Sequence, residues 1–176
     1  MAWKHIEGWF SVYDNLVNME ITKAVPSNGT VVCLGVWHGR SLVALMEELT
    51  KLGKTEVTIM AVDIFPADTL TIATDYLGEW RNLWIVKADI VEASKLVANE
   101  SIDAIYIDAD HSYKGSKEAL VAWLPRVKSC GIVSGHDYQP NWPGVIQAVD
   151  ETFAEVLVKG CSYWTTKRTQ TDSTKQ

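Results

Sequence analysis

The chain has 176 residues and a formal net charge of −6, from 16 Lys+Arg and 22 Asp+Glu, with 47% hydrophobic and 22% charged residues. This composition is typical of a globular protein, and the length allows one domain with a sizeable core. The basic residues are scattered through an acidic chain, whereas a nucleic-acid partner needs a clustered basic footprint, so we expect none.

The compartment is predicted from what the sequence lacks. No apolar run approaches the roughly 20 residues of a membrane span, and the first residues have no apolar signal-peptide core. Cys33, Cys130 and Cys161 are odd in number and widely spaced, so we expect them to be reduced and mostly buried. A cytoplasmic protein with no membrane partner is the expectation.

The first predicted element is an amphipathic helix from His5 to Met19, where apolar residues recur at helical spacing. Short apolar runs then predict five strands, with helical patterns between them. The strands are Val31–Leu34, Val57–Val62, Leu83–Val86, Ile102–Ile107 and Ile132–Ser134, and the helices are Ser41–Leu52, Ala67–Leu77, Val91–Asn99 and Tyr113–Val127. Strands that alternate with helices and are apolar on both faces predict a parallel sheet covered on both sides.

The chain closes differently. A helix is predicted over Gly144–Phe153, directly after Pro143, and Val156–Lys159 with Tyr163–Thr166 predict an antiparallel hairpin. The expected fold class is α/β, a three-layer Rossmann-like sandwich with a mostly parallel seven-stranded sheet and a C-terminal antiparallel hairpin. We expect one domain over residues 1–166, with an N-terminal helical cap over 1–28 and a polar tail over 167–176.

Ligands of an open α/β sheet bind beyond the carboxyl ends of the strands, so residues after each apolar run are the first candidates. Gly35 and Gly39 follow the first strand and allow a tight turn into a helix with free N–H groups, although a plain βα turn would look the same. Asp63 after the second strand suits the hydroxyls of a ribose or caps a turn. Asp89 after the third suits an adenine amine or a helix cap, and we favour the cap.

The fourth and fifth strands end in denser polar clusters. Asp108, Asp110 and His111 follow the fourth strand, and His136 and Asp137 follow the fifth. A cap of the next helix by Asp110 or Ser112 would explain one acid but not the cluster. Neighbouring strands would bring Asp108, His136 and Asp137 together as ligands for Mg²⁺ or a similar ion. Without metal, His136 would be a general base, with His111 as the second candidate.

On these residues the sequence resembles the class I S-adenosylmethionine-dependent methyltransferases. Within them it resembles a small subgroup with a Gly-x-x-x-Gly-x-Ser first motif and strand ends of the Asp-x-Asp-His-Ser-Tyr and His-Asp-Tyr type. The resemblance implies an enzyme of the EC 2.1.1 class that uses S-adenosyl-L-methionine, with or without Mg²⁺ or another divalent cation. The acceptor would be a small hydroxylated metabolite or a sugar, methylated on oxygen, and a homodimer is compatible with the family.

Two other functions stay open. One is a module that binds S-adenosylmethionine without transferring the methyl group. The other is an NAD-dependent Rossmann oxidoreductase, which is disfavoured because the first turn lacks the Gly-x-Gly-x-x-Gly spacing.

The resemblance also implies roles for individual residues. Catalysis would fall to His136, Asp108 and His111, and the metal positions of related enzymes match Asp108, His136 and Asp137. Asp63 would bind the ribose, and Asp89 would lie near the adenine amine. The remaining cofactor positions are Gly35, Trp37, Gly39 and Ser41 for the methionine and ribose side, Ile64 or Phe65 for the adenine, and Asp110 or His111 for the methionine end.

Two positions depart from the family pattern. Cys33 replaces the usual acid of the first strand, and His136 replaces a carboxylate of the metal-dependent relatives, which lowers the expected affinity for a hard cation. The lid and acceptor walls are expected from the aromatic N-terminal segment with Trp3, Trp9 and Phe10, and from the loop 138–142. Core packing is the alternative, which we favour for Trp9 and Phe10.

Overall fold

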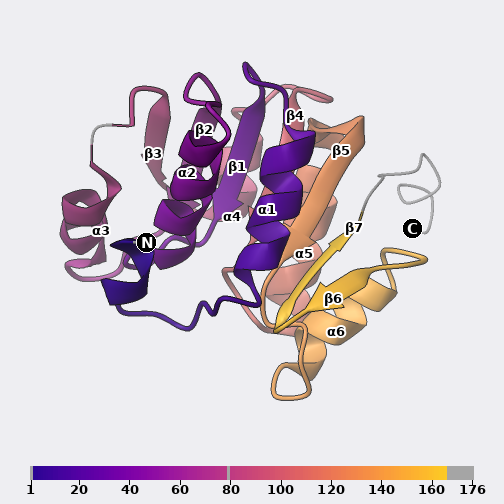
Figure 1. The fold of residues 1–176 in the computed structure, drawn as a ribbon. Helices are drawn as coiled ribbons and strands as arrows, with labels where there is room; N and C mark the ends of the chain where they lie inside the picture. The colour runs from indigo at the N-terminus through magenta and orange to yellow at the C-terminus, as the bar shows by residue number, and fades with distance from the viewer. Residues whose placement is uncertain (1, 79, 166–176) are drawn as a thin grey trace.

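The computed structural model of the chain describes residues 2–78 and 80–165. Its centre is a seven-stranded sheet in the order β3-β2-β1-β4-β5-β7-β6, in which β7 pairs antiparallel with β5 and β6 and the other pairs are parallel (Figure 1). The strands are β1 (Thr30–Leu34), β2 (Thr58–Asp63), β3 (Leu83–Lys87), β4 (Ile102–Ile107), β5 (Val127–Gly135), β6 (Leu157–Lys159) and β7 (Ser162–Thr165). The predicted sheet and terminal hairpin are confirmed.

Helices cover both faces of the sheet. One face carries α1, α2 and α3, and the other carries α4, α5 and α6 (Figure 1). The helices are α1 (Asn15–Ala24), α2 (Arg40–Lys51), α3 (Thr69–Leu77), α4 (Ile90–Ser94), α5 (Tyr113–Trp123) and α6 (Pro143–Asp150), with 3-10 turns η1 (Ala2–His5) and η2 (Leu124–Arg126). The architecture is therefore the predicted three-layer α/β sandwich.

The central strands are mostly apolar because both of their faces are covered. In β1, Val31 and Cys33 pack into the cluster beneath α1 and α2, whereas Val32 and Leu34 pack into the cluster beneath α5 and α6. Successive side chains of a strand point to opposite faces, so both faces of β1 are apolar after Thr30. The polar groups after the strands are therefore the ones free to contact a ligand.

The N-terminal prediction was wrong in its detail. A helix was expected over His5–Met19, but α1 begins only at Asn15, and residues 6–14 cross the carboxyl edge of the sheet as an irregular strap. Arg40 of α2 donates to the carbonyl oxygens of Ile6 (2.7 Å) and Phe10 (2.9 Å), which a continuous helix would use internally. Gly8, at φ +150°, adopts a conformation outside the helical range.

Other boundaries also moved. The helices expected to end at Asn99 and Phe153 end at Ser94 and Asp150. The helix expected to end at Val127 ends at Trp123, because Pro125 has no N–H to donate and the chain tightens into η2. Strand β5 starts at Val127, earlier than the expected Ile132, and its register against β4 shifts between Ile102 and Ala104. Its carboxyl end, Gly135, lies one residue beyond the predicted Ser134.

Some expectations concern other parts of the molecule. All three cysteines are free thiols, but Cys130 is exposed rather than buried. No helix within residues 2–78 and 80–165 is long and apolar enough to cross a membrane. The predicted end of the hairpin at Thr166 and the predicted tail 167–176 lie outside the described residues.

Candidate active site

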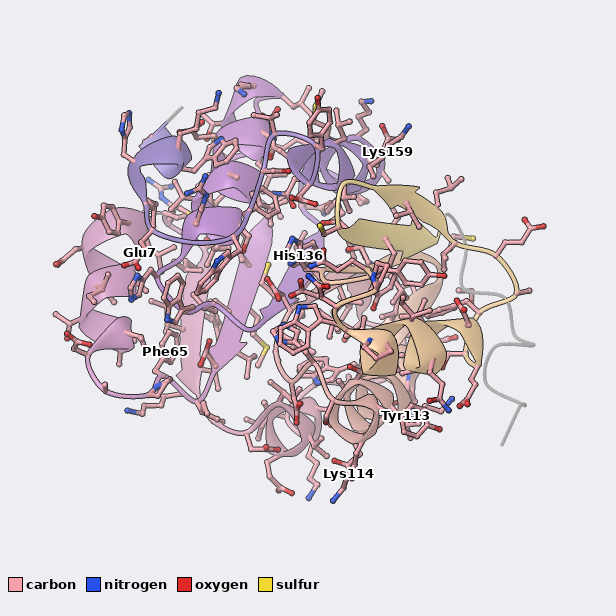
Figure 2. The ribbon with its side chains drawn as sticks, turned by 90° about the horizontal axis from the view of Figure 1, so that it is seen from below. Glu7, Phe65, Tyr113, Lys114, His136 and Lys159 are labelled. Carbon is pink, nitrogen blue, oxygen red and sulfur yellow. The ribbon has the colours of Figure 1, made fainter. Side chains whose placement is uncertain are left out.

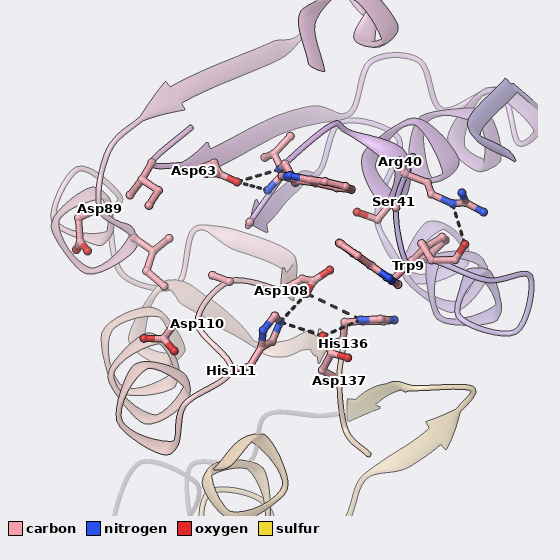
Figure 3. A pocket seen from close by; sticks show the side chains of 18 residues that line it. Trp9, Arg40, Ser41, Asp63, Asp89, Asp108, Asp110, His111, His136 and Asp137 are labelled. Carbon is pink, nitrogen blue, oxygen red and sulfur yellow. Dashed lines mark hydrogen bonds and ion pairs between the residues drawn. The ribbon is translucent and has the colours of Figure 1, made fainter. Parts of the chain in front are cut away.

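A cavity of about 660 Å³ opens at the carboxyl edge of the sheet, where β1, β2, β4 and β5 end (Figure 3). Figure 2 looks onto this edge, with His136 near the middle of the view. The volume is in the range of small-molecule sites. Apart from Gly39 and Phe65, the predicted site residues line it: Gly35, Trp37, Ser41, Asp63, Ile64, Asp89, Asp108, Asp110, His111, His136 and Asp137.

Gly39 and Phe65 do not line the cavity but belong to the structure that surrounds it. Gly39 is the N-cap of α2 in a left-handed conformation, with φ of 87°. Phe65 is 1% exposed and packs in the hydrophobic core, whereas Ile64 beside it is 61% exposed and lines the cavity. Of the two residues considered for an adenine contact, only Ile64 has a side chain that lines the cavity.

The loop after β1 depends on a glycine. Gly35 has φ of 81°, and a Cβ at this position would overlap the backbone carbonyl oxygen of Asp108. Only glycine combines this backbone conformation with such a close approach. The loops after β1 and β4 are thereby held in backbone contact, at the floor of the cavity.

Asp63 fixes the same loop from the other side. Its Oδ2 accepts hydrogen bonds from the backbone N–H groups of Val36 (2.6 Å) and Trp37 (2.9 Å), and its Oδ1 accepts from Phe65 (2.7 Å). Trp37 has φ of 48°, which is unfavourable for a residue with a side chain. The carboxylate therefore caps the turn after β2, one of the two roles expected from the sequence, and also holds the strained turn after β1.

The next two acids are placed by local hydrogen bonds. Asp89 accepts from the N–H groups of Val91 and Glu92 and caps α4, as favoured from the sequence. Asp110 accepts from Ser112 N–H at 2.8 Å, and this backbone hydrogen bond lowers the pKa of its carboxyl group. Both carboxylates also line the cavity, so capping and ligand contact are compatible.

On the side of the cavity formed after β4 and β5, histidine and aspartate side chains alternate in a series of close contacts. His111 Nε2 lies 2.9 Å from Asp137 Oδ2 and 3.4 Å from Asp108 Oδ1. His136 Nδ1 lies 3.2 Å from the same Asp137 oxygen and 3.9 Å from Asp108 Oδ1. On its far side, His136 Nε2 lies 3.6 Å from Asp14 Oδ2, an ion-pair distance too long for a hydrogen bond.

These contacts favour charged histidines. Burial alone would lower the pKa of His136, but Asp137 and Asp14 outweigh it and raise the pKa to about 10. Hydrogen bonds to Asp108 and Asp137 raise the pKa of His111 to about 9. Burial would raise the pKa of Asp137, yet its bonds to the two histidines hold it well below the usual range. The raised pKa values favour the imidazolium form of both histidines at neutral pH, which disfavours their action as bases.

Asp14 is the site residue that the sequence did not reveal. It is 2% exposed, and its carboxylate accepts from Ser11 and from Cys161 and Ser162 of the hairpin while facing His136. Burial would raise the pKa of Asp14, but His136 and Ser11 hold it well below the usual range. Asp14 lies in the segment expected to be helix, and no motif marks it.

The expected metal ligands are partly brought together. Among the described residues, Asp108, His111 and Asp137 form the group whose ligand atoms all lie within 4.8 Å of one another. His136 approaches the same carboxylates, but only 5% of it is exposed. A cation at this group would have to displace the proton that the carboxylates hold on His111.

The aromatic residues divide differently from the prediction. Trp3 and Phe10 are buried, at 1% and 4% exposure. Trp9, expected in the core, is 81% exposed and lines the cavity, with its ring stacked on Trp37 at 5.0 Å. Trp142 is 40% exposed and packs against the ring of His111 at 4.6 Å. The strap and the loop 138–142 therefore both supply aromatic groups next to the site.

A comparison with family profiles finds a methyltransferase domain over residues 32–138. This match runs from Val32 in β1 past the end of β5 and covers every predicted site residue of the chain. A comparison with curated protein sequences gives no match.

Solved structures share the fold at low sequence identity. A TDP-rhamnose 3'-O-methyltransferase of calicheamicin biosynthesis is 18% identical, with 85% of this chain and 75% of that chain covered and a TM-score of 0.65. An S-adenosylmethionine-dependent O-methyltransferase from Thermotoga maritima is 12% identical (92% and 67% covered, TM-score 0.68). An rRNA methylase from Streptococcus thermophilus is 12% identical (89% and 96% covered, TM-score 0.66). Their acceptors differ, so the likeness concerns the fold.

Proposed function

Since the chain belongs to the class I S-adenosylmethionine-dependent methyltransferases, we propose that it methylates a hydroxyl oxygen of a small metabolite. The observation that carries this proposal is the shared cavity, in which the glycine loop after β1 faces the ionic cluster after β4 and β5. A cofactor held at the first would present its methyl group to an acceptor held at the second.

The lining suits the cofactor in shape and charge. S-adenosylmethionine carries a sulfonium, an ammonium and a carboxylate and is a net cation, and the carboxylates of Asp63, Asp89, Asp108 and Asp110 border the cavity. Cys33 does not contribute a charge, because burial raises the pKa of its thiol to about 12. Asp63 and Ile64 would hold the adenosine part, and Gly35 with Ser41 would border the methionine part.

The chain's own residues would orient the acceptor and handle its proton. When bound, S-adenosylmethionine supplies an electrophilic methyl group with a good leaving group. Asp108 lies between the glycine loop after β1 and the ionic cluster after β4 and β5. Its carboxylate would accept the hydroxyl proton as the oxygen bonds to the methyl carbon. The imidazolium of His111 would stabilise the negative charge that develops on this oxygen. His136 is too buried to reach an acceptor and would hold Asp137 in place.

A divalent cation in the ionic cluster after β4 and β5 is a second way to activate the acceptor hydroxyl. Asp108, His111 and Asp137 would hold it, and it would lower the pKa of a bound hydroxyl group. The raised pKa of His111, to about 9, opposes this arrangement at neutral pH. Binding of Mg²⁺ or Mn²⁺ would therefore strengthen as the pH rises from 7 to 9.

The first test is calorimetric titration with S-adenosylmethionine and S-adenosylhomocysteine, with and without Mg²⁺, and with NAD for comparison. We expect micromolar binding of the first two. Ile64→Ala should weaken S-adenosylhomocysteine roughly tenfold, because the exposed Ile64 side chain would be buried by the adenine. Leu96→Ala is the matched control, since Leu96 is 75% exposed and lies outside the cavity lining.

Three results would separate the alternatives. Binding of NAD alone would replace the proposal with a dinucleotide-dependent reaction. Binding of S-adenosylmethionine with no methyl transfer to any hydroxylated acceptor would indicate a binding module. Failure of both adenosyl compounds to bind would overturn the proposed function.

A further inference from the structure

The cations that line the cavity are all engaged by the protein itself. Arg40 directs its guanidinium to the carbonyl oxygens of Ile6 and Phe10, where it pins the strap. His111 and His136 each lie within ion-pair distance of Asp108 and Asp137. Among the described lining residues, therefore, each cationic side chain is already engaged and none is free to pair with a phosphate or carboxylate group of the acceptor.

The remaining charge of the cavity is negative. Asp63, Asp89, Asp108, Asp110 and Asp137 line it, against the three engaged cations. An anionic group placed 4 Å from one of these carboxylates would be repelled by about 1 kcal/mol even at the dielectric of water, and by more in a partly enclosed site. The cavity therefore disfavours anionic acceptors.

One exposed surface in the cavity is suited to a ring. The indole of Trp9 projects between Ser41 and the Asp108–His136 side of the cavity (Figure 3). One of its faces stacks on Trp37, with an interplanar angle of 24°, and Trp37 in turn stacks on His38 at 3.8 Å. Trp9 nevertheless remains 81% exposed.

The residues behind this indole are held by hydrogen bonds. Asp63 holds the backbone of Trp37, and Arg40 grips the carbonyl oxygen of Phe10, directly after Trp9. A stacked and braced indole loses little conformational freedom when a second ring packs on it, so it can contribute strongly to binding.

We propose that Trp9 is the stacking platform for the acceptor, and that the acceptor is an uncharged hydroxylated ring without a phosphate or carboxylate group. The inference rests on the proposed methyl transfer and narrows its substrate class. Nucleotide-linked sugars, acyl thioesters of phosphorylated carriers and nucleic acids are excluded. A phenolic ring and a free sugar ring share the required chemistry, since both can stack on an indole.

The test uses two matched pairs of probes with protein saturated with S-adenosylhomocysteine. Catechol is compared with 3,4-dihydroxybenzoate, and methyl β-D-glucopyranoside with glucose 6-phosphate, by calorimetry and by saturation-transfer NMR. We expect at least one neutral probe to bind at least tenfold more tightly than its anionic partner, and the pair in which this occurs identifies a phenolic or a sugar acceptor. Trp9→Ala should weaken the neutral probe at least tenfold, and Trp9→Phe by less. Trp84→Ala, at an exposed tryptophan outside the cavity lining, should change nothing.

Equal or tighter binding of the anionic probes would overturn the inference. So would unchanged binding in Trp9→Ala, or no binding of either neutral ring to the cofactor-loaded protein. Binding of S-adenosylhomocysteine is measured first, so a failure of the proposed function is recognised separately. In that case the same probes are titrated into the free protein, and their relative affinities test the preference for neutral rings independently of the cofactor.

Discussion

The two halves of the cavity are built by different physical means. After β1 and β2, backbone contacts set the geometry: Gly35 approaches the carbonyl oxygen of Asp108, and Asp63 accepts the N–H groups of Val36 and Trp37. After β4 and β5, side-chain charges set it, through contacts between His111, His136 and three carboxylates. The first half should be sensitive to backbone changes and the second to charge and pH.

The largest effect on stability should come from disrupting the loops after β1 and β2, whose geometry is set by backbone contacts. Gly35→Ala combines a left-handed backbone with an overlap on the Asp108 carbonyl oxygen, so we expect the free energy of unfolding to fall by about 4 kcal/mol. Gly53→Ala is the control, because Gly53 has φ of 68° but open space around its Cβ, and should cost about 1 kcal/mol. Urea unfolding measures both. Equal losses would mean that the close approach to β4 contributes nothing.

The same division explains what the sequence could predict. Gly35, Asp63 and Asp108 were found because parallel strands end at one edge, and the residue after each apolar run must lie there. The neighbouring positions of β4 and β5, and with them of Asp108 and His136, were also predicted. Short-range patterns are sufficient for features that the backbone determines.

The residues that were missed depend on contacts distant in sequence. The N-terminal apolar pattern fitted a helix, but Arg40 of α2 takes two carbonyl oxygens of that segment and straightens it into the strap. Trp9 consequently points into the cavity instead of the core. Asp14 faces His136 only because β7 inserts beside β5 and brings the hairpin onto α1. No local pattern encodes these tertiary contacts.

The second prediction concerns the buried end of the ionic cluster after β4 and β5. Asp14→Asn removes a carboxylate that is 2% exposed and leaves His136 facing a neutral group, so we expect a loss of about 3 kcal/mol in the free energy of unfolding. Glu92→Gln, which breaks the exposed pair with Lys95, should cost less than about 1 kcal/mol. Urea unfolding at pH 7 compares the two variants. Similar losses would mean that burial adds nothing to the Asp14–His136 pair.

The smallest effect is the pH dependence of the Asp14→Asn loss. The pKa of His136 is raised from its ordinary 6.5 to about 10 in the folded protein, so the imidazolium contributes its full stabilisation below pH 6.5. This contribution is lost as the pH rises through about 10. The groups that face His136 and sustain the shift are Asp14, Asp137 and Asp108.

If Asp14 sustains the charge of His136, wild type should lose more stability than Asp14→Asn between pH 6.5 and 10. The gap between them should narrow by roughly 1–2 kcal/mol, because the variant has less imidazolium stabilisation to lose. Urea unfolding of both proteins at pH 6.5, 8 and 10 measures the gap, with Glu92→Gln expected to run parallel to wild type. A gap that stays constant would assign the role of Asp14 to its hydrogen bonds with Ser11, Cys161 and Ser162. The ionic half of the cavity would then be held, like the other half, by uncharged donors.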